Sequence, residues 1–577
     1  MRFVLQGAEG DGSHAIDDQD KDGSLREKWN NVFCKSGLYG LRPSQAAALE
    51  AASLISEYDG TGLFTSMAVG DGKTLLLLLI TQLYPDVERA LLLLDPKLVP
   101  EFEEENAKWR PHFHLMTPQL MTYSRFSHKE STAALRDYNP DLIMADECQA
   151  LKNAKSARGL RFFRYMKENP NTRFIATTGT IEDKCISEYT HLLRLSLGPL
   201  NWLPRHKAEM NRWVSVLSND GEPAKEDVDI WRPLAEFYGE KWPASEASRI
   251  EAARRAYRER LSTCPGVLMT SESSCTEPLT YHIVRDPVPE ALAAELGKMM
   301  TGYKLPNGDE IVDAAEMTRH RRTMAVGFYN RWDWDAVDAD DEWLLARNEW
   351  SRQVRAYLSS HAREGCDSPA LVEAWVENNQ PRNGLTEALK AWNAVRHLKK
   401  PPTIPVWVNY AVLQNPVRWL NAPGKATRIL WYYSPAVGDA LEMLGCRVNR
   451  KLPKPSARRM PRVCLPFTAF HRGQNLQDYD EHRLIEPTPN GARLEQWGGR
   501  GHRGGRKGAV ELFVDGRTHK QLETVETAVE RSWGAANRNR QKRKMFLECT
   551  TWANPTPRIR EIIRRSPASV LENQPCL

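Results

Sequence analysis

The segment Gly70-Asp71-Gly72-Lys73-Thr74 follows the apolar residues 63–69 and opens the helix-like residues 73–83. A loop between a buried strand and a helix can bind phosphate groups, because its glycines let backbone N–H groups approach and the helix N-terminus attracts anions. We expect Lys73 to reach the terminal phosphates of a nucleotide and Thr74 to ligate Mg²⁺. Met67 occupies the position of the first glycine in the general GxxxxGKT pattern, so the chain departs from that pattern at one place.

Two further motifs follow strand-like segments. Asp146-Glu147 comes directly after the apolar residues 142–145. A carboxylate at the end of a strand can hold Mg²⁺, and an adjacent Glu can polarise an attacking water molecule. Thr178-Gly179-Thr180 follows the apolar residues 174–177, and we expect its hydroxyl groups to link a nucleotide site to a nucleic-acid site.

A fourth motif lies near the other end of the chain, where residues 496–503 read QWGGRGHR and fit Q-x-x-G-R-x-x-R. Arg500 and Arg503 are three residues apart, which predicts that they share one face of a helix. Such a pair can reach across a cleft and stabilise charge on a γ-phosphate. The alternative is a basic loop that binds nucleic acid.

Composition limits the class of protein. A chain of 577 residues with 41% hydrophobic and 27% charged residues predicts two or three globular domains. The sequence contains no apolar run long enough for a membrane span, and its start does not resemble a secretory signal. Ten cysteines without CxxC pairs argue against structural zinc and disulfides and favour a reducing cytosol. The net charge is +5, and residues 498–507 and 538–565 are basic, which is typical of either phosphate-binding or solvated surfaces.

Hydrophobic patterning predicts the organisation of an α/β protein. Residues 63–69, 90–95, 142–146 and 174–178 are predicted strands, with helices at 73–83 and 99–109, which indicates a parallel sheet. The alternation resumes with strands at 429–434, 462–467, 483–486 and 510–514. We therefore divide the chain into a lead-in (1–37), a first lobe (38–204), a mainly helical insertion (205–424), a second lobe (425–518) and a basic helical C-terminal extension (519–577).

Together these motifs resemble those of superfamily 2 helicases, and more narrowly the Swi/Snf-type ATPases. Residues 146–153 (DECQALKN) are similar to the family's DEAHxLKN, and residues 178–182 (TGTIE) to its TGTPxxN, with Ile181 in place of proline. Residues 473–477 (GQNLQ) resemble motif V, and residues 496–506 resemble QxxDRxHRxGQ, with Gly499 in place of Asp. The resemblance covers about residues 38–204 and 425–515. No chromatin-reading module flanks it, which fits a compact prokaryotic or phage-encoded member.

The resemblance implies two RecA-like lobes that bind ATP and Mg²⁺ between them. The implied catalytic residues are Lys73, Asp146, Glu147, Gln496, Arg500 and Arg503, and Thr74 and Asp146 are the implied metal ligands. The implied ATP-binding residues are Arg42, Gln45, Gly70, Asp71, Gly72, Lys73 and Thr74. The implied nucleic-acid contacts are Lys97, Thr122, Thr178, Gly179, Thr180 and Asn475.

The function implied is that of a DNA-dependent ATP hydrolase that moves along double-stranded DNA in the cytoplasm of a bacterial or phage-infected cell, with a nuclear location left open. A strand-separating DNA or RNA helicase and a non-hydrolysing nucleic-acid clamp are the alternatives. Nucleic acid is the expected partner, no membrane contact is expected, and the oligomeric state stays open.

Two other segments have competing interpretations. Residues 327–332 with Arg319, Arg321 and Arg322 mix aromatic rings and cations, and we favour packed helices over an element that contacts a nucleic-acid strand. Residues 538–544 (RNRQKRK) favour contact with DNA over a merely exposed helix face.

Overall fold

The computed structural model of the chain describes residues 41–55, 62–67, 72–110, 115–128, 131–154, 156–179, 185–218, 223–239, 241–269, 275–311, 314–337, 340–361, 369–379, 384–399, 401–450, 460–470, 475–539 and 543–565. Gly70, Asp71, Thr180 and the predicted lead-in of residues 1–37 lie outside these ranges.

The first lobe contains a parallel sheet of six strands in the order β3-β2-β4-β5-β1-β6. The strands are β1 (Gly62–Ser66), β2 (Ala90–Leu94), β3 (Gln119–Thr122), β4 (Leu142–Ala145), β5 (Arg173–Thr178) and β6 (Val267–Met269). Every residue of β1, β2 and β4 is buried, because helices cover both faces of the sheet.

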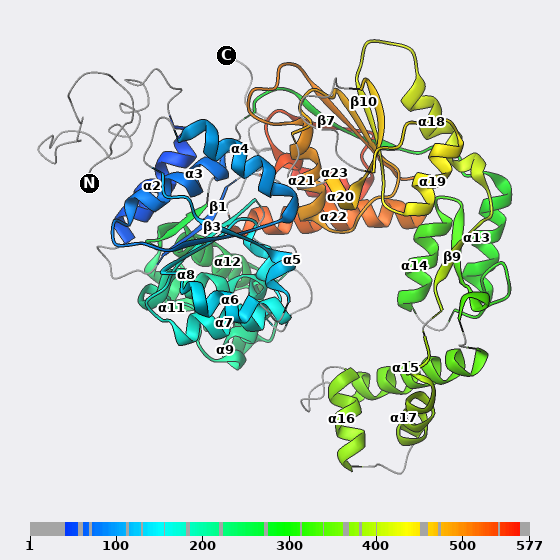
Figure 1. Cartoon of the computed structure of the whole chain (residues 1–577), viewed down its shortest axis with the longest axis horizontal. Coiled ribbons are helices and arrows are strands. Elements are labelled where there is room, and N and C mark those ends of the chain that lie inside the picture. The colour runs from blue at the N-terminus through cyan, green and yellow to red at the C-terminus, as the bar shows by residue number, and fades with distance from the viewer. Residues whose placement is uncertain are drawn as a thin grey trace, which may run out of the picture.

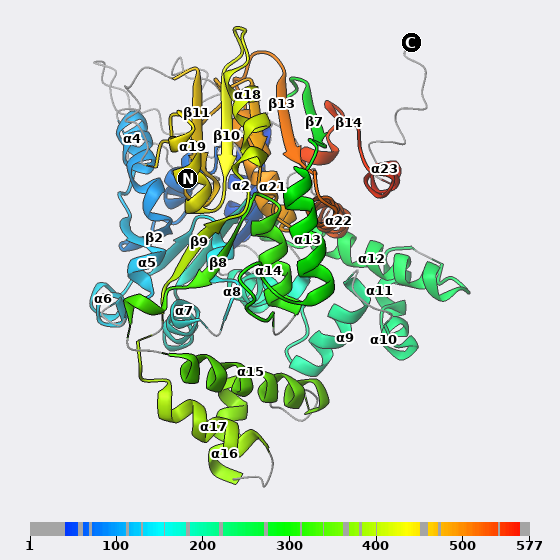
Figure 2. The same ribbon diagram turned by 90° about the vertical axis from the view of Figure 1, so that its right-hand side faces the viewer.

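Figure 1 shows α2 (Pro43–Leu54), α3 (Lys73–Ile80) and α4 (Val99–Trp109) on one face of this sheet. The opposite side carries α5 (Tyr123–Phe126), α6 (Ser131–Tyr138), α7 (Ala157–Glu168), α8 (Thr190–Leu197), α9 (Lys207–Leu217), α11 (Arg232–Phe237) and α12 (Glu246–Thr263). Figure 2 shows α10 (Lys225–Asp229) beside α9 and α11. Trp231 of the α10–α11 turn and Tyr257 of α12 lie in the same hydrophobic core as Phe174 of β5. The first lobe therefore extends past its predicted end at residue 204, because these helices bury their apolar faces against its sheet.

The second lobe also has a six-stranded parallel sheet, in the order β11-β10-β12-β13-β7-β14. Its strands are β7 (Leu279–Val284), β10 (Arg428–Tyr432), β11 (Arg462–Pro466), β12 (Glu481–Leu484), β13 (Val510–Asp515) and β14 (Thr550–Ala553). Both β7 and β14 fall outside the predicted bounds 425–518. They complete the sheet because parallel pairing joins strands that are distant in sequence.

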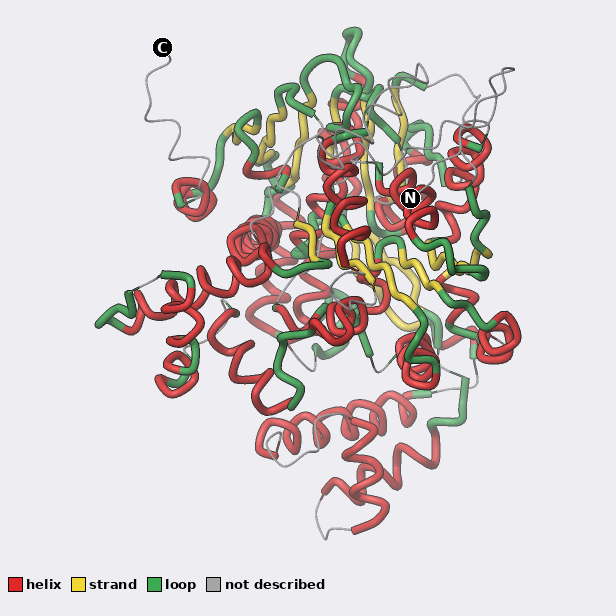
Figure 3. The backbone as a smooth tube through the Cα atoms, turned by 90° about the vertical axis from the view of Figure 1, so that its left-hand side faces the viewer, coloured by secondary structure: helices red, strands yellow, loops and turns green. Residues whose placement is uncertain are grey.

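The two sheets with helices on their faces confirm the predicted α/β fold of two RecA-like lobes, and Figure 3 shows the strands of each lobe enclosed by helices. The helices of the second lobe are α18 (Gln414–Asn421), α19 (Pro435–Met443), α20 (Phe467–Phe470), α21 (Gly491–Gly501), α22 (His519–Asn539) and α23 (Pro557–Arg564). None of the helices that the structure describes is long and apolar enough to span a bilayer.

The insertion is built from α13 (Glu290–Gly302), α14 (Ala314–Met324), β8 (Phe328–Trp332), α15 (Asp341–His361), α16 (Pro369–Asn379), α17 (Gly384–Val395) and β9 (Thr403–Trp407). Residues 328–332 form a strand that pairs antiparallel with β9, so the expectation of packed helices there was wrong. Met324 of α14 and Phe328 share a core with Leu430 of β10, which attaches this part of the insertion to the second lobe. Figures 1 and 2 show α15, α16 and α17 projecting away from both lobes.

The basic C-terminal segment is folded into the second lobe. Arg538, Arg543 and Lys544 are each at most 5% exposed. Glu495 of α21 accepts hydrogen bonds from the Lys544 backbone N–H at 2.5 Å and the Ser532 hydroxyl at 2.6 Å. The charge of Arg543 lowers the pKa of this buried carboxylate, although burial has the larger effect and raises it. Because the three basic side chains are buried, they are not in position to contact DNA.

Candidate active site

A cavity of about 370 Å³ lies between the two lobes. Its lining includes Gly72, Lys73, Thr74, Asp146 and Glu147 from the first lobe and Arg493, Arg500 and Arg503 from the second. Gly72 and Lys73 follow β1, and Asp146 follows β4, so the carboxyl ends of two parallel strands bring them together. The predicted phosphate loop, carboxylates and arginine pair thus converge on one cleft.

Gly72 is the N-cap of α3 and has a φ of 77°, in the left-handed region that favours glycine. A Cβ atom at this position would lie 2.4 Å from Nε2 of Gln45. That same Nε2 donates a hydrogen bond of 2.9 Å to the Gly72 carbonyl, and Gln45 Oε1 accepts one of 3.0 Å from the Arg42 backbone N–H. In this structure Gln45 supports the backbone of the phosphate loop and is itself buried.

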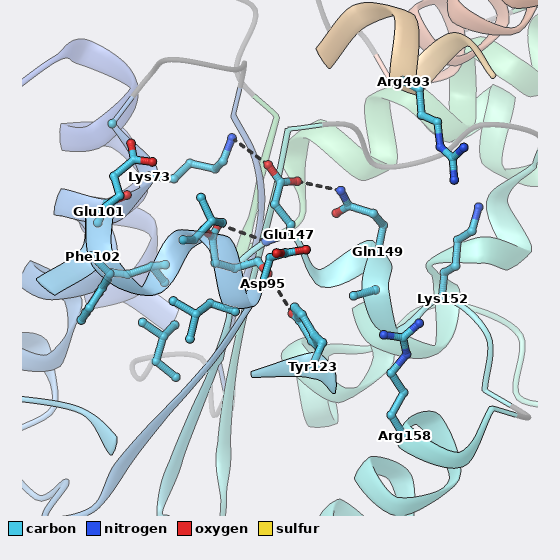
Figure 4. Close-up of a pocket in the computed structure, with 18 of the residues that line it drawn as sticks. Lys73, Asp95, Glu101, Phe102, Tyr123, Glu147, Gln149, Lys152, Arg158 and Arg493 are labelled. Atoms are coloured by element: carbon cyan, nitrogen blue, oxygen red, sulfur yellow. Dashed lines mark hydrogen bonds and ion pairs between the residues drawn. The ribbon is translucent and has the colours of Figure 1, made fainter. Parts of the chain in front are cut away.

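Lys73 is the first residue of α3, and its ammonium group lies beside Glu147 (Figure 4). The distance from Lys73 Nζ to Glu147 Oε1 is 3.8 Å, and Nζ also donates to the Met67 carbonyl at 3.4 Å. Both side chains of the ion pair are 11% exposed, so water screens their attraction only in part. The lysine is therefore held at the cleft by a carboxylate and a carbonyl, two anionic or dipolar partners that a phosphate group can replace.

Asp146 follows β4 directly and is half-buried. Its Oδ1 accepts hydrogen bonds from the Thr177 hydroxyl at 3.2 Å and the Glu147 backbone N–H at 3.0 Å. Burial raises the pKa of Asp146 to about 6, the charge of Glu147 adds to this shift, and Lys73 opposes it. A carboxyl group in such a place regains its charged form when a cation binds next to it, so the donor set fits a divalent metal ion.

Glu147 has a φ of 51° and a ψ of 54°, a left-handed conformation that is uncommon for a residue with a side chain. Its Oε2 accepts hydrogen bonds from Gln149 Nε2 at 2.7 Å and from the Gly179 backbone N–H at 3.3 Å. The Thr178 hydroxyl in turn donates to Gln149 Oε1 at 2.7 Å. A chain of hydrogen bonds therefore joins Thr178 to the carboxylate of Glu147.

This chain of bonds changes the expected role of residues 178–179. Thr178 is 1% exposed and Gly179 is buried, so neither is in position to contact nucleic acid as predicted. Burial follows from their place at the end of β5, in the middle of the sheet. Through Gln149 and the Gly179 backbone N–H, they hold the carboxylate of Glu147 in place at the cleft.

The arginine pair differs in detail from the prediction of one helical face. Arg500 lies on α21, but that helix ends at Gly501 and Arg503 follows its C-cap, His502. Both nevertheless line the cleft, where their charges lower the pKa of Glu101 on α4, although burial has the larger effect and raises it. Gln496 is buried at 1% exposure and does not line the cleft.

The remaining predicted nucleic-acid contacts have local partners. Lys97 Nζ donates a hydrogen bond of 2.8 Å to the carbonyl of Ala469 in the second lobe. Thr122 caps α5 by accepting a bond of 3.3 Å from the Arg125 backbone N–H. Asn475 Oδ1 accepts from the Gln477 backbone N–H at 3.2 Å. Lys97 and Asn475 are exposed and Thr122 is half-buried, so a further contact stays a prediction.

Several residues of the cleft were not predicted from the sequence, among them Glu101, Lys152, Arg158 and Arg493. Figure 4 shows Arg493 of the second lobe and Lys152 of the first pointing toward the same space. Lys152 belongs to the DECQALKN segment, so that motif could have predicted its place at the cleft. No motif includes Glu101 or Arg493, because these two residues become neighbours only when the two lobes approach each other.

No family model matches the chain. No curated protein matches it either. Among solved structures, the Sulfolobus solfataricus SWI2/SNF2 ATPase core in complex with dsDNA matches at 13% identity, covers 89% of this chain and 96% of that one, and has a TM-score of 0.30. A superposition of this quality assigns no function, and the fold rests on the two sheets described above.

Proposed function

We propose that this protein is an ATP-driven motor that moves along double-stranded DNA. The observation that carries the proposal is the convergence of Lys73, Asp146 and Glu147 from one lobe and Arg500 and Arg503 from the other on a single cavity. Phosphoryl transfer needs this combination, because charge that develops on the phosphates must be met from more than one side.

Each side chain has a role that its place in the cleft allows. Lys73 and the N-terminus of α3 would hold the phosphates, and Thr74 and Asp146 would ligate Mg²⁺. Bound Mg²⁺ would supply charge neutralisation on the phosphate oxygens. Glu147 would orient and polarise the attacking water, aided by its bonds to Gln149 and Gly179.

Arg500 and Arg503 make hydrolysis dependent on the position of the second lobe. They can stabilise the transition state only when the cleft is closed around the nucleotide, and product release then favours opening. Lys97 spans the cleft to Ala469 and would have to release that carbonyl when the lobes move apart. Cycles of closure and opening are the physical basis of movement along a polymer.

Residues 146–153 and 496–506 resemble motifs of the Swi/Snf-type ATPases, and this resemblance favours double-stranded DNA as the polymer along which the protein moves. Contacts to phosphates would dominate such binding, so affinity should depend on salt and only weakly on sequence.

The test is ATP hydrolysis by the full chain with DNA duplex, single-stranded DNA or RNA as activator. We expect the duplex to stimulate hydrolysis most. The same protein should displace the third strand of a DNA triplex without unwinding a forked duplex. Unwinding of the fork would favour the strand-separating helicase, and nucleic-acid binding without any ATP hydrolysis would favour the clamp.

A further inference from the structure

A second cavity, of about 550 Å³, adjoins the nucleotide cleft on the side of the insertion. Its lining carries six cationic side chains, which are Lys152, Arg319, Arg322, Arg493, Lys520 and Arg531. They come from the first lobe, from α14 of the insertion and from α21 and α22 of the second lobe. Three separate parts of the chain thus direct positive charge into one space.

Carboxylates compensate this cluster only in part. The one carboxylate in the described lining is Glu486, and its two oxygens accept hydrogen bonds from the Tyr433 and Ser434 backbone N–H groups at 2.6 and 2.8 Å and from the Ser434 hydroxyl at 2.5 Å. Two of the six cations pair with carboxylates outside the lining: Lys152 with Glu188 at 3.2 Å and Lys520 with Glu523 at 3.0 Å. The guanidinium groups of Arg319 and Arg322 make no hydrogen bond or ion pair with any residue that the structure describes.

Arg319 and Arg322 lie one turn apart on α14, and both line this cavity. Burial lowers the pKa of Arg322, Tyr433 raises it, the nearby charge of Arg531 lowers it, and the charge of Glu523 raises it. Cations held together in this way repel one another, and an anion between them removes the repulsion. Pro489 and Asn490, at the N-terminus of α21, also line the cavity and add the positive end of an 11-residue helix.

We propose that this cavity binds consecutive phosphates of a nucleic-acid backbone, with Arg319 and Arg322 of the insertion as contact residues. This inference rests on the proposed function. Six cations exceed the charge of one phosphate group, whereas each DNA strand presents one charge about every 3.4 Å. The aromatic side chain in the lining is Tyr433, and its hydroxyl accepts a hydrogen bond from Arg493, so the cavity reads the backbone and offers no row of rings on which bases stack.

The position of the cavity also suggests how DNA binding reaches the nucleotide. Lys152 and Arg493 line both cavities. Arg493 lies near the start of α21 and Arg500 near its end. A phosphate that binds Arg493 therefore pulls on the helix that also carries Arg500. Because the helix is rigid, the two arginine side chains shift together.

The test compares the double variant Arg319→Gln/Arg322→Gln with the control Arg321→Gln, which changes the same helix but is not part of the described lining. Binding of a short fluorescein-labelled DNA duplex is measured by anisotropy over a series of NaCl concentrations. Losing two phosphate contacts should reduce the slope of log K against log salt by about 1.8, which is roughly sixtyfold weaker binding near 0.1 M salt. The control should bind like wild type.

Two readouts separate this inference from the proposed function. ATP hydrolysis without DNA should be unchanged in the double variant, while stimulation by DNA should need proportionally more duplex. If wild type hydrolyses ATP in response to DNA and the double variant keeps the wild-type salt slope, the cavity assignment is wrong and the motor stands. Inorganic tripolyphosphate is the second probe: if it protects wild type but not the double variant against heat while DNA affinity stays equal, the cavity is a small-anion site and the proposal is overturned.

Discussion

The ammonium group of Lys73 lies 3.8 Å from the carboxylate of Glu147, and the two side chains are equally buried. The cation and the carboxylate thus neutralise each other on the first-lobe side of the cleft. The pair explains how both charges tolerate a largely dry environment.

Replacing Lys73 with Ala should reduce ATP hydrolysis at least ~100-fold, since it removes a charge that stabilises the phosphates. DNA binding should persist, because Lys73 faces the nucleotide cleft. The matched control is Lys108→Ala, an exposed lysine on α4 that pairs with Glu105. Near-wild-type hydrolysis by the Lys73 variant would contradict the assigned role.

Replacing Gly72 with Ala should weaken nucleotide binding roughly tenfold or more, because a left-handed backbone costs a residue with a side chain ~1–2 kcal/mol. The new methyl group would also meet Gln45 Nε2. Isothermal titration with a non-hydrolysable ATP analogue measures the loss. Gly239→Ala, which also has positive φ but no atom near its Cβ position, is the control and should affect stability alone.

Replacing Thr178 with Val should lower kcat several-fold with little change in the KM for ATP. The substitution keeps the volume of the side chain but removes its hydrogen bond to Gln149, which orients Glu147. Thr172→Val is the control, because the Thr172 hydroxyl bonds to the Pro140 carbonyl just before the same strand and away from the cleft. Both variants should lose about 1 kcal/mol of stability, so unequal kcat values isolate the catalytic effect.

Replacing Glu101 with Gln should lower the KM for ATP several-fold. Glu101 attracts Arg500 and Arg503 in the cleft. Without the charge of Glu101, the two arginines interact with the phosphates of ATP alone and bind them more tightly. Glu104→Gln, an exposed change on the same helix, should leave the KM unchanged. An increased KM in the Glu101 variant would show that this carboxylate assists binding.

The second lobe should lose stability as the pH falls below about 6.5. Burial lowers the pKa of His482 to about 3, so the unfolded chain binds a proton that the folded chain excludes. The stability that this histidine contributes is complete above its ordinary pKa, and by pH 5 about 2 kcal/mol is lost. Urea unfolding at several pH values measures the slope. His482→Gln should flatten it, and the exposed His128→Gln should not.

Much of the local structure follows from the sequence. The predicted helix at residues 99–109 matches α4, and the predicted strands at 462–467 and 510–514 match β11 and β13 to within a residue. These segments were predictable because hydrophobic period and capping act over a few neighbouring residues. The phosphate loop and the Asp146-Glu147 pair were found for the same reason, since each motif is contiguous.

Other features depended on contacts over long sequence distances. The strand β7 has alternating burial and reads as an ordinary amphipathic segment, yet it lies between β13 and β14, strands that follow it by more than two hundred residues. The burial of Arg538 and Arg543 could not be predicted either. A run of cations normally faces solvent, whereas here both arginines are buried and the charge of Arg543 acts on the buried carboxylate of Glu495.

The sequence by itself determined the strands, the helices and the chemical groups available for binding phosphate, because these depend on short-range periodicity and residue type. The tertiary structure decided which of those groups meet. The Lys97 contact with Ala469, the shared cavity of Lys73 and Arg500, and the cationic cavity of Arg319 and Arg322 all join separate parts of the chain. Electrostatic attraction and repulsion depend on the distance between charges in space, so only the folded structure determines which charges interact.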